Sequence, residues 1–183
     1  MSKFILHTKE TADDLAKPLL ENSLKSFGMI PNLHAVMAEA PTLLEAYQVV
    51  DNLFKRTSLS NDEQTVVWQT INIEHQCRYC VPAHTAIANM MGVGDHISDA
   101  LRNKTPLPDK LEALREFTLK IIRQRGRIEE ADLRSFFEAG YTKQNAFEVI
   151  LGLSQKVMSN YVNHISETPV DLPFKSFSWQ PSE

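Results

Sequence analysis

Cysteine is scarce in this sequence of 183 residues, which contains only Cys77 and Cys80. Two thiols three positions apart cannot form the disulfide framework that stabilises small secreted folds. In an intracellular chain, such a pair is typical of catalytic redox chemistry or of metal binding. The scarcity of cysteine therefore directs attention to one short segment.

The sequence also lacks long apolar runs, a signal peptide and an excess of basic charge. No run approaches the roughly 18 apolar residues that a membrane span needs. The opening MSKFILHTKETADD has no h-region and no small-residue cleavage site. The 19 basic and 23 acidic residues give a net charge of -4, whereas proteins that bind nucleic-acid backbones usually present a basic face. We therefore expect a cytoplasmic protein that binds neither membranes nor nucleic acids.

Strand-like alternation and hairpin dipeptides are absent, and almost every segment has a helical period of apolar residues. Residues 42–55 illustrate this period, and Ser60 with Glu63 forms a capping-box pattern ahead of the next helix. The sequence therefore predicts an all-α fold of about eight or nine helices. The lack of βαβ units excludes the thioredoxin fold as the carrier of the two cysteines.

Prolines suggest how the chain is organised. The linker 105–108 is the best internal boundary, although we predict a single all-α domain over 1–183. A lobe over 42–104 would carry the cysteines, and a second helical lobe would span 109–166. The tail 167–183 contains three prolines and three aromatic residues. We expect this tail to be an ordered segment that lays its aromatic side chains on a groove or on a neighbouring subunit.

Pro82 indicates where the helix after the cysteines begins. A proline is tolerated in the first turn of a helix but not in its interior, so this helix starts near Tyr79 or Cys80. Cys80 then lies among unpaired N–H groups at the positive end of the helix dipole, where a thiolate is favoured. The turn also lets the sulfur of Cys77 reach that of Cys80. One sulfur can attack and the other can resolve the intermediate into a disulfide, with the order left open.

His84 follows Cys80 by four residues, which is one helical turn along the same face. Its imidazole can take the thiol proton and later return it to a leaving group. Glu74 lies three residues before Cys77 and is a candidate for the last proton acceptor. The residues by themselves therefore predict a dithiol site with a histidine relay.

Two other interpretations of this segment stay open. The two cysteines and His84 can bind zinc with His75 or Glu74 as a fourth ligand, although structural zinc sites usually carry a second ligand pair further along. The cysteines can also be buried apolar residues beside a structural histidine. Haem attachment is excluded, because Val81 stands where Cys-x-x-Cys-His requires the histidine.

Four segments together resemble the alkylhydroperoxidase AhpD-like, or carboxymuconolactone decarboxylase-like, family. They are LSNDEQ at 59–64, CRYCVPAH at 77–84, NYVNH at 160–164 and the tail at 168–179. The resemblance covers most of the chain and is strongest to the peroxidase-related branch. It implies an all-helical fold that assembles into homo-oligomers, as dimers, trimers or hexamers.

The resemblance also implies a thiol peroxidase or disulfide reductase that uses no haem, metal or flavin cofactor. Cys77 and Cys80 match the redox pair of the family, and His84 matches its relay histidine. The implied substrate is a hydroperoxide. The implied reductant is a thiol or a lipoyl group, with a peroxiredoxin as a further partner.

Two positions depart from the family pattern. Thr65 stands where AhpD has its relay glutamate, twelve residues before the first cysteine, and Tyr79 stands where AhpD has a histidine. Glu63, half a turn from Thr65 on the same predicted helix, and Glu74 are candidate substitutes for that glutamate. We therefore predict catalytic roles for Glu63 and Glu74 beside the dithiol and its histidine.

Two alternative functions are also compatible with the sequence. One is a non-redox lyase, a lactone decarboxylase or isomerase on the same fold, although members of that kind generally lack the cysteine pair. The other is a helical interaction module without enzymatic activity, stabilised by a Cys/His metal site.

Overall fold

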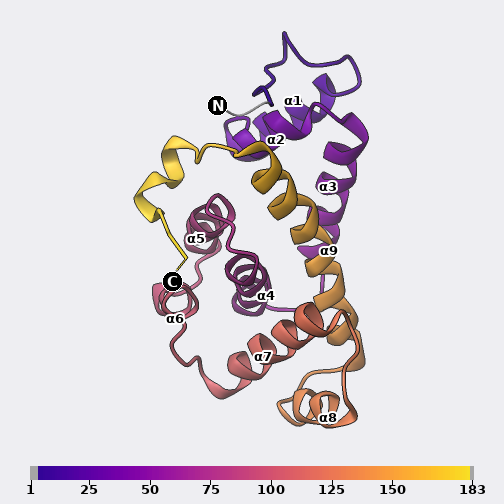
Figure 1. The fold of residues 1–183 in the computed structure, drawn as a ribbon, viewed down its shortest axis with the longest axis vertical. Helices are drawn as coiled ribbons and strands as arrows, with labels where there is room; N and C mark the ends of the chain where they lie inside the picture. Colours follow the sequence, from indigo (N-terminus) through magenta and orange to yellow (C-terminus); the bar gives the residue numbers. More distant parts are fainter. Residues whose placement is uncertain (1–3, 182–183) are drawn as a thin grey trace.

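The structure is a computed structural model that describes residues 4–181. Within that range the chain forms nine α-helices and one short 3-10 helix and contains no strand, which confirms the predicted all-α class (Figure 1). The elements are α1 (Lys17–Phe27), α2 (Asn32–Met37), α3 (Pro41–Phe54), α4 (Asn61–Glu74), α5 (Cys80–Met90), α6 (Asp95–Asn103), α7 (Asp109–Gln124), α8 (Glu130–Glu138), α9 (Lys143–Ser166) and η1 (Leu172–Phe177).

Local sequence rules set the starts of the two helices nearest the cysteines. The Ser60 hydroxyl accepts the N–H of Glu63, and the Glu63 carboxylate accepts the N–H of Ser60, so α4 begins with the predicted capping box. Helix α5 begins at Cys80, with Pro82 in its first turn, as the proline predicted.

Helix α4 is the central element of the fold. It packs against α5, α6, α7 and α9, while α9 runs alongside α3 and α8 packs on α7 at one end of the molecule (Figure 1). One buried cluster surrounds Trp68, and a second contains both cysteines together with Leu20 and Leu44. The division into lobes at 42–104 and 109–166 stays a prediction, and α4 makes close contacts across it.

Gly152 of α9 lies directly against side chains of α3 and α4. A Cβ atom at Gly152 would lie 2.7 Å from Cε2 of Phe54 and 2.8 Å from Cγ1 of Val67, so a residue with a side chain does not fit without movement. Lys156 follows one turn later on α9 and is buried. The missing side chain of Gly152 therefore lets α9 bring its buried residues up to the neighbouring helices.

The chain after α9 folds back against α5. The 3-10 helix η1 packs on α5, and Arg102 of α6 donates to the carbonyls of Phe177 at 2.8 Å and of Ser178 at 3.1 Å. Trp179 Nε1 donates in return to the carbonyl of Arg102 at 3.4 Å. Residues 182 and 183 of the tail predicted over 167–183 lie outside the described residues.

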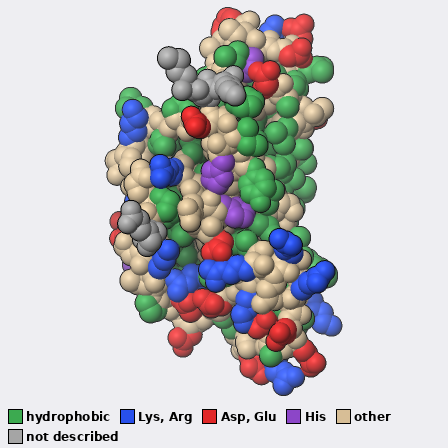
Figure 2. Space-filling model, in the orientation of Figure 1, with side chains coloured by type: hydrophobic (Ala, Val, Ile, Leu, Met, Phe, Trp, Pro, Cys, Tyr) green, Lys and Arg blue, Asp and Glu red, His purple; other side chains and the backbone are tan. Residues whose placement is uncertain are grey.

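Two surface properties bear on what the chain contacts. Hydrophobic side chains gather along the edge where α3 and α9 run (Figure 2). The large hydrophobic side chains of these two helices that are exposed are Val49 and Leu53 of α3 and Phe147, Ile150, Tyr161 and Ile165 of α9. Among residues 4–181, no helix combines the length and the apolar character that crossing a bilayer requires.

Candidate active site

Cys77 and Cys80 lie at the turn that leads into α5. Both are free thiols and both are buried, with exposed fractions of 0% and 2%. The backbone N–H of Cys80 donates to the sulfur of Cys77 at 3.1 Å, so the turn folds the first cysteine onto the start of the helix. The structure therefore assembles the dithiol that the spacing predicted.

Helix α9 supplies a hydrogen-bond donor to this pair. The Asn163 side chain places Nδ2 at 3.1 Å from Sγ of Cys80 and at 4.0 Å from Sγ of Cys77. An N–H group at this range favours the anionic form of the sulfur it contacts. Because Asn163 lies closer to Cys80, it stabilises the thiolate of Cys80 more than that of Cys77.

The two sulfurs differ in acidity. Burial opposes ionisation of the Cys80 thiol, but the hydrogen bond from Cys77, the positive charge of Lys156 and the amide of Asn163 outweigh it, so the pKa of Cys80 lies below its ordinary value. Burial, and then the neighbouring Cys80, raise the pKa of Cys77. Cys80 therefore ionises first while Cys77 keeps its proton.

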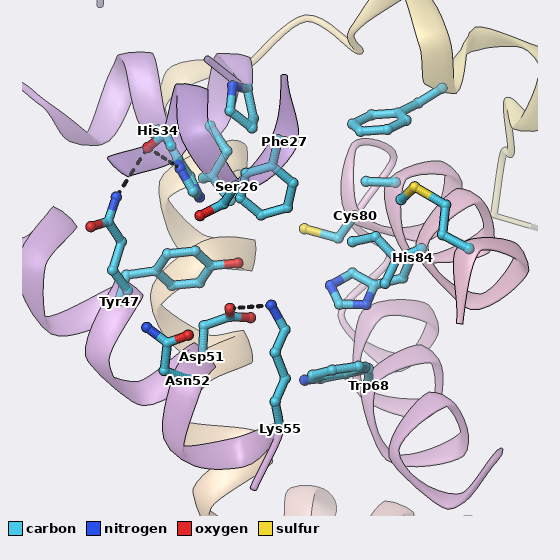
Figure 3. A pocket seen from close by; sticks show the side chains of 18 of the residues that line it. Ser26, Phe27, His34, Tyr47, Asp51, Asn52, Lys55, Trp68, Cys80 and His84 are labelled. Atoms are coloured by element: carbon cyan, nitrogen blue, oxygen red, sulfur yellow. Dashed lines mark hydrogen bonds and ion pairs between the residues drawn. The ribbon is translucent and has the colours of Figure 1, made fainter. Parts of the chain in front are cut away.

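His84 lies one turn after Cys80 on α5. Its imidazole stands between the Cys80 side chain and the Trp68 indole, 5.0 Å from Trp68 between ring centroids (Figure 3). Nε2 lies 2.6 Å from Nζ of Lys156, while Nδ1 is buried and has no hydrogen-bond partner among the described residues. Burial, and then Lys156, lower the pKa of His84 well below its ordinary value, so the imidazole is neutral near pH 7.

A cavity of about 820 Å³ opens between α1–α3 on one side and α4–α5 on the other (Figure 3). This volume falls within the range of small-molecule sites. Aromatic side chains line both walls, and Cys80, His84 and Lys156 also border the cavity. Cys77 is not one of the lining residues. A molecule that enters the cavity therefore meets Cys80 and not Cys77.

The two carboxylates predicted to be catalytic, Glu63 and Glu74, are paired with basic residues of α7. Glu63 serves the capping box and lies 2.8 Å from Nζ of Lys110. Glu74 accepts two hydrogen bonds from Arg123, at 2.7 Å and 2.9 Å. Within residues 4–181, no hydrogen bond or ion pair joins either carboxylate to a cysteine or to His84. Their catalytic role stays a prediction.

The residues proposed as zinc ligands also have other partners. Nε2 of His84 faces an ammonium group, and Nδ1 of His75 bonds to Oδ1 of Asn160 at 2.9 Å. In the described part of the chain, no group of three or more His, Cys, Asp or Glu side chains is arranged to hold a metal ion. The donor set of the zinc interpretation is therefore not assembled here.

Sequence reasoning missed Lys156 and the contact that Asn163 makes. Both lie on α9 and are separated from the dithiol by more than 70 residues along the chain. The available signal is the polarity of a buried helix face, which consists of Gln155, Lys156, Ser159, Asn160 and Asn163. Buried polar side chains on one helix face usually have partners there, so this pattern indicates a site.

No protein-family model and no curated protein match the sequence. Solved structures do match the fold. An AhpD-core protein from Ralstonia eutropha JMP134, described as an uncharacterized peroxidase-related protein, is 21% identical with a TM-score of 0.83 over 94% of both chains. A peroxidase-related protein from Silicibacter sp. TM1040 is 20% identical with a TM-score of 0.79, over 94% of this chain and 93% of the other.

A third match is a cysteine-to-alanine variant of the debrominase Bmp8 in complex with 2,3,4-tribromopyrrole. It is 14% identical with a TM-score of 0.77, over 96% of this chain and 97% of the other. These similarities agree with the arrangement of the nine helices described above. The resemblance drawn from the sequence is thus confirmed at the level of structure, and the chain has the AhpD-like fold.

Proposed function

We propose that this protein is a thiol-dependent oxidoreductase that reduces hydroperoxides with the Cys77–Cys80 dithiol. The observation that carries the proposal is the position of Cys80. Its thiol has a lowered pKa, the residue lines a cavity large enough for a small organic molecule, and the sulfur of Cys77 lies against its backbone N–H. A nucleophilic thiolate, a substrate space and a resolving thiol are the three parts that this chemistry needs.

The reaction begins when the Cys80 thiolate attacks the terminal oxygen of the hydroperoxide. A sulfur–oxygen bond forms and the O–O bond breaks, so the sulfur is oxidised to a sulfenic acid and an alkoxide leaves. The alkoxide takes up a proton and becomes an alcohol, and His84, which lines the same cavity one turn after Cys80, is the donor candidate. The Cys77 thiol then attacks the sulfenic acid, forming the disulfide and releasing water.

An external dithiol must then reduce this disulfide. An incoming thiolate can approach through the cavity, attack Cys80 and release Cys77, because only Cys80 borders that space. This route favours small thiols or a lipoyl arm as donors. A peroxiredoxin partner would have to present its cysteine on a flexible segment, since the Cys80 sulfur is buried.

Reductive dehalogenation is a second candidate function. It is favoured by the bound tribromopyrrole in the Bmp8 structure and by the aromatic side chains Phe27, Tyr47 and Trp68 that line the cavity here. Both reactions draw two electrons from the same dithiol, so the choice of substrate distinguishes them.

The test is consumption of cumene hydroperoxide, hydrogen peroxide or a bromopyrrole by the purified protein with dihydrolipoamide. We expect Cys80→Ser to abolish turnover, and Cys77→Ser to leave a sulfenic acid that dimedone traps for mass spectrometry. A wild-type protein that consumes none of these substrates faster than Cys80→Ser would overturn the proposal. A lactone decarboxylase activity that survives alkylation of both thiols would instead favour the non-redox lyase.

We also propose that the protein is a homo-oligomer that buries the exposed apolar edge of α3 and α9. Phe147 and Ile165 of α9 are 73% and 70% exposed, and apolar side chains gather along this edge (Figure 2). Large exposed apolar patches on a protein surface usually mark an interface. Sedimentation analysis of the wild type and of Phe147→Glu tests this. A monomeric wild type would contradict it.

A further inference from the structure

We propose that Lys156 is a positioning residue of the dithiol site, acting both as the counter-ion of the Cys80 thiolate and as the source of the proton that His84 delivers. This inference rests on the proposed hydroperoxide reduction. It gives the buried ammonium of Lys156 the proton-relay role that the sequence had suggested for the carboxylates of Glu63 and Glu74.

The first argument is the geometry of Lys156. The side chain is 1% exposed, although lysine is almost never fully buried without a partner. Its Nζ lies 2.6 Å from Nε2 of His84, and Lys156 is one of the residues that line the cavity together with Cys80. The close approach of α9 at Gly152, one turn earlier, holds this part of the helix against its neighbours.

The second argument is the balance of charge around the ammonium. Burial lowers the pKa of Lys156, and the negative charges of Cys80 and Cys77, from the turn that enters α5, and of Asp51 from α3 oppose this shift. Lys55 of α3 is a second positive charge nearby, and His84 is bonded to the ammonium. The phenol of Tyr47 also lies on this side, near Gln155 and Ser159.

Asp51 is the only carboxylate in that set, and it is already occupied. One of its oxygens pairs with Nζ of Lys55 at 2.5 Å, and the other accepts from Nε2 of Gln155 at 2.9 Å. Within residues 4–181, Lys156 forms no ion pair with any carboxylate. A buried charge without a counter-ion is costly, so the anion that balances Lys156 is the Cys80 thiolate.

The third argument is the orientation of the His84 proton. An ammonium group can only donate, so Nε2 of His84 accepts and the neutral imidazole carries its hydrogen on Nδ1. That Nδ1 atom is buried without a partner, which is costly for a donor. His84 lines the same cavity as Cys80, so we assign the missing acceptor to an oxygen of a substrate that enters the cavity far enough to reach Nδ1.

These features describe one balanced step. As the thiolate attacks the O–O bond, Nδ1 of His84 gives its proton to the leaving alkoxide while Lys156 passes a proton to Nε2. The products are a sulfenic acid, an alcohol, a neutral imidazole and a neutral amine. The negative and positive charges of the buried pair therefore disappear together, and reduction of the disulfide by an external dithiol restores both.

Two substitutions separate the two roles of Lys156. Lys156→Met removes the charge, and we expect the midpoint of the thiolate titration at 240 nm to rise by about 1–3 pH units. Lys156→Arg keeps the charge but does not release a proton, so we expect a midpoint near that of the wild type with peroxide reduction slowed at least tenfold. Lys143→Met, an exposed position on the same helix, is the matched control for both measurements.

An unchanged midpoint in Lys156→Met would overturn the counter-ion role, and wild-type turnover in Lys156→Arg would overturn the proton role. The ¹⁵N shifts of His84 in the unmodified protein test the geometry without any substitution. A proton on Nδ1 supports the inference, and a proton on Nε2 contradicts it. If the wild type reduces no peroxide at all, the proposed function is wrong. The thiolate titration of the wild type and Lys156→Met would still show whether Lys156 is the counter-ion of Cys80.

Discussion

The hydroxyl of Tyr79 donates to Oδ2 of Asp171 at 2.6 Å and so joins the turn between the two cysteines to the C-terminal tail. The other carboxylate oxygen of Asp171 accepts the backbone N–H of Asn32 at the start of α2. Asp171 is buried, and Phe174 just beyond it lines the cavity. The C-terminal tail therefore forms one side of the cavity, and it is fixed there by Tyr79, which lies between the two cysteines in the sequence.

Replacing Tyr79 by Phe should loosen the tail. The substitution leaves a buried carboxylate oxygen without its donor, so we expect the free energy of unfolding to fall by about 1–3 kcal/mol. Hydrogen exchange of residues 168–178 should accelerate relative to the wild type. Tyr161→Phe, at a half-exposed tyrosine on α9, is the control. Equal exchange in Tyr79→Phe and Tyr161→Phe would show that the hydrogen bond does not hold the tail.

Replacing Asn163 by Ala should make Cys80 less reactive at neutral pH. Loss of the N–H donor at 3.1 Å raises the pKa of the Cys80 thiol, so less thiolate is present at pH 7. A hydrogen bond to a charged group contributes about 1.5–3 kcal/mol, so alkylation by iodoacetamide should slow about tenfold or more. The pH profile of alkylation should move to higher pH. Ser154→Ala on the exposed side of α9 should leave the profile in place.

Replacing Glu74 by Gln tests whether this carboxylate takes part in catalysis. Because Glu74 is paired with Arg123 at a partly exposed position, we expect a loss of at most about 1 kcal/mol in stability and peroxide turnover within about twofold of the wild type. Glu63→Gln should behave similarly, because glutamine also completes a capping box. A tenfold loss of turnover in either variant, with an unchanged unfolding curve, would instead support the carboxylate role predicted from the sequence.

The buried His34 should make the protein less stable in acid. Burial lowers the pKa of His34 to about 4, whereas in the unfolded chain it lies near the ordinary 6.5. Between these values the unfolded chain binds a proton that the folded protein does not, so stability falls as the pH drops below about 6.5. The loss from this residue reaches about 3 kcal/mol near pH 4, and His84 adds to it with the same sign.

Guanidinium unfolding of the wild type and of His34→Gln at pH 7, 6, 5 and 4.5 measures this effect. Carboxylates contribute equally to both proteins below pH 5, so the difference between the two curves isolates His34. We expect the variant to lose less stability on acidification. Parallel pH dependence in the two proteins would contradict the burial argument.

The features of the site that depend only on residues close together in the chain could be predicted from the sequence. The capping box of Ser60, the start of α5 near Pro82 and the placement of His84 one turn after Cys80 all depend on residues within four positions of each other. Helical geometry fixes such relationships wherever the helix lies. The all-α class was predictable for the same reason, since the helical periods run along almost the whole chain. The AhpD-like fold was expected only from the resemblance of four segments to that family, and the solved structures confirm it.

The partners of the reactive groups could not be inferred in that way. Lys156 reaches His84 across 72 positions in the sequence, and Asn163 reaches Cys80 across 83. The carboxylates of Glu63 and Glu74, near the dithiol in sequence, instead face Lys110 and Arg123 on α7. These distances depend on how closely whole helices pack, which small residues such as Gly152 permit. Local patterns thus specify the helices and the dithiol, whereas the charge and the protons around the dithiol come from contacts that form only when distant helices meet.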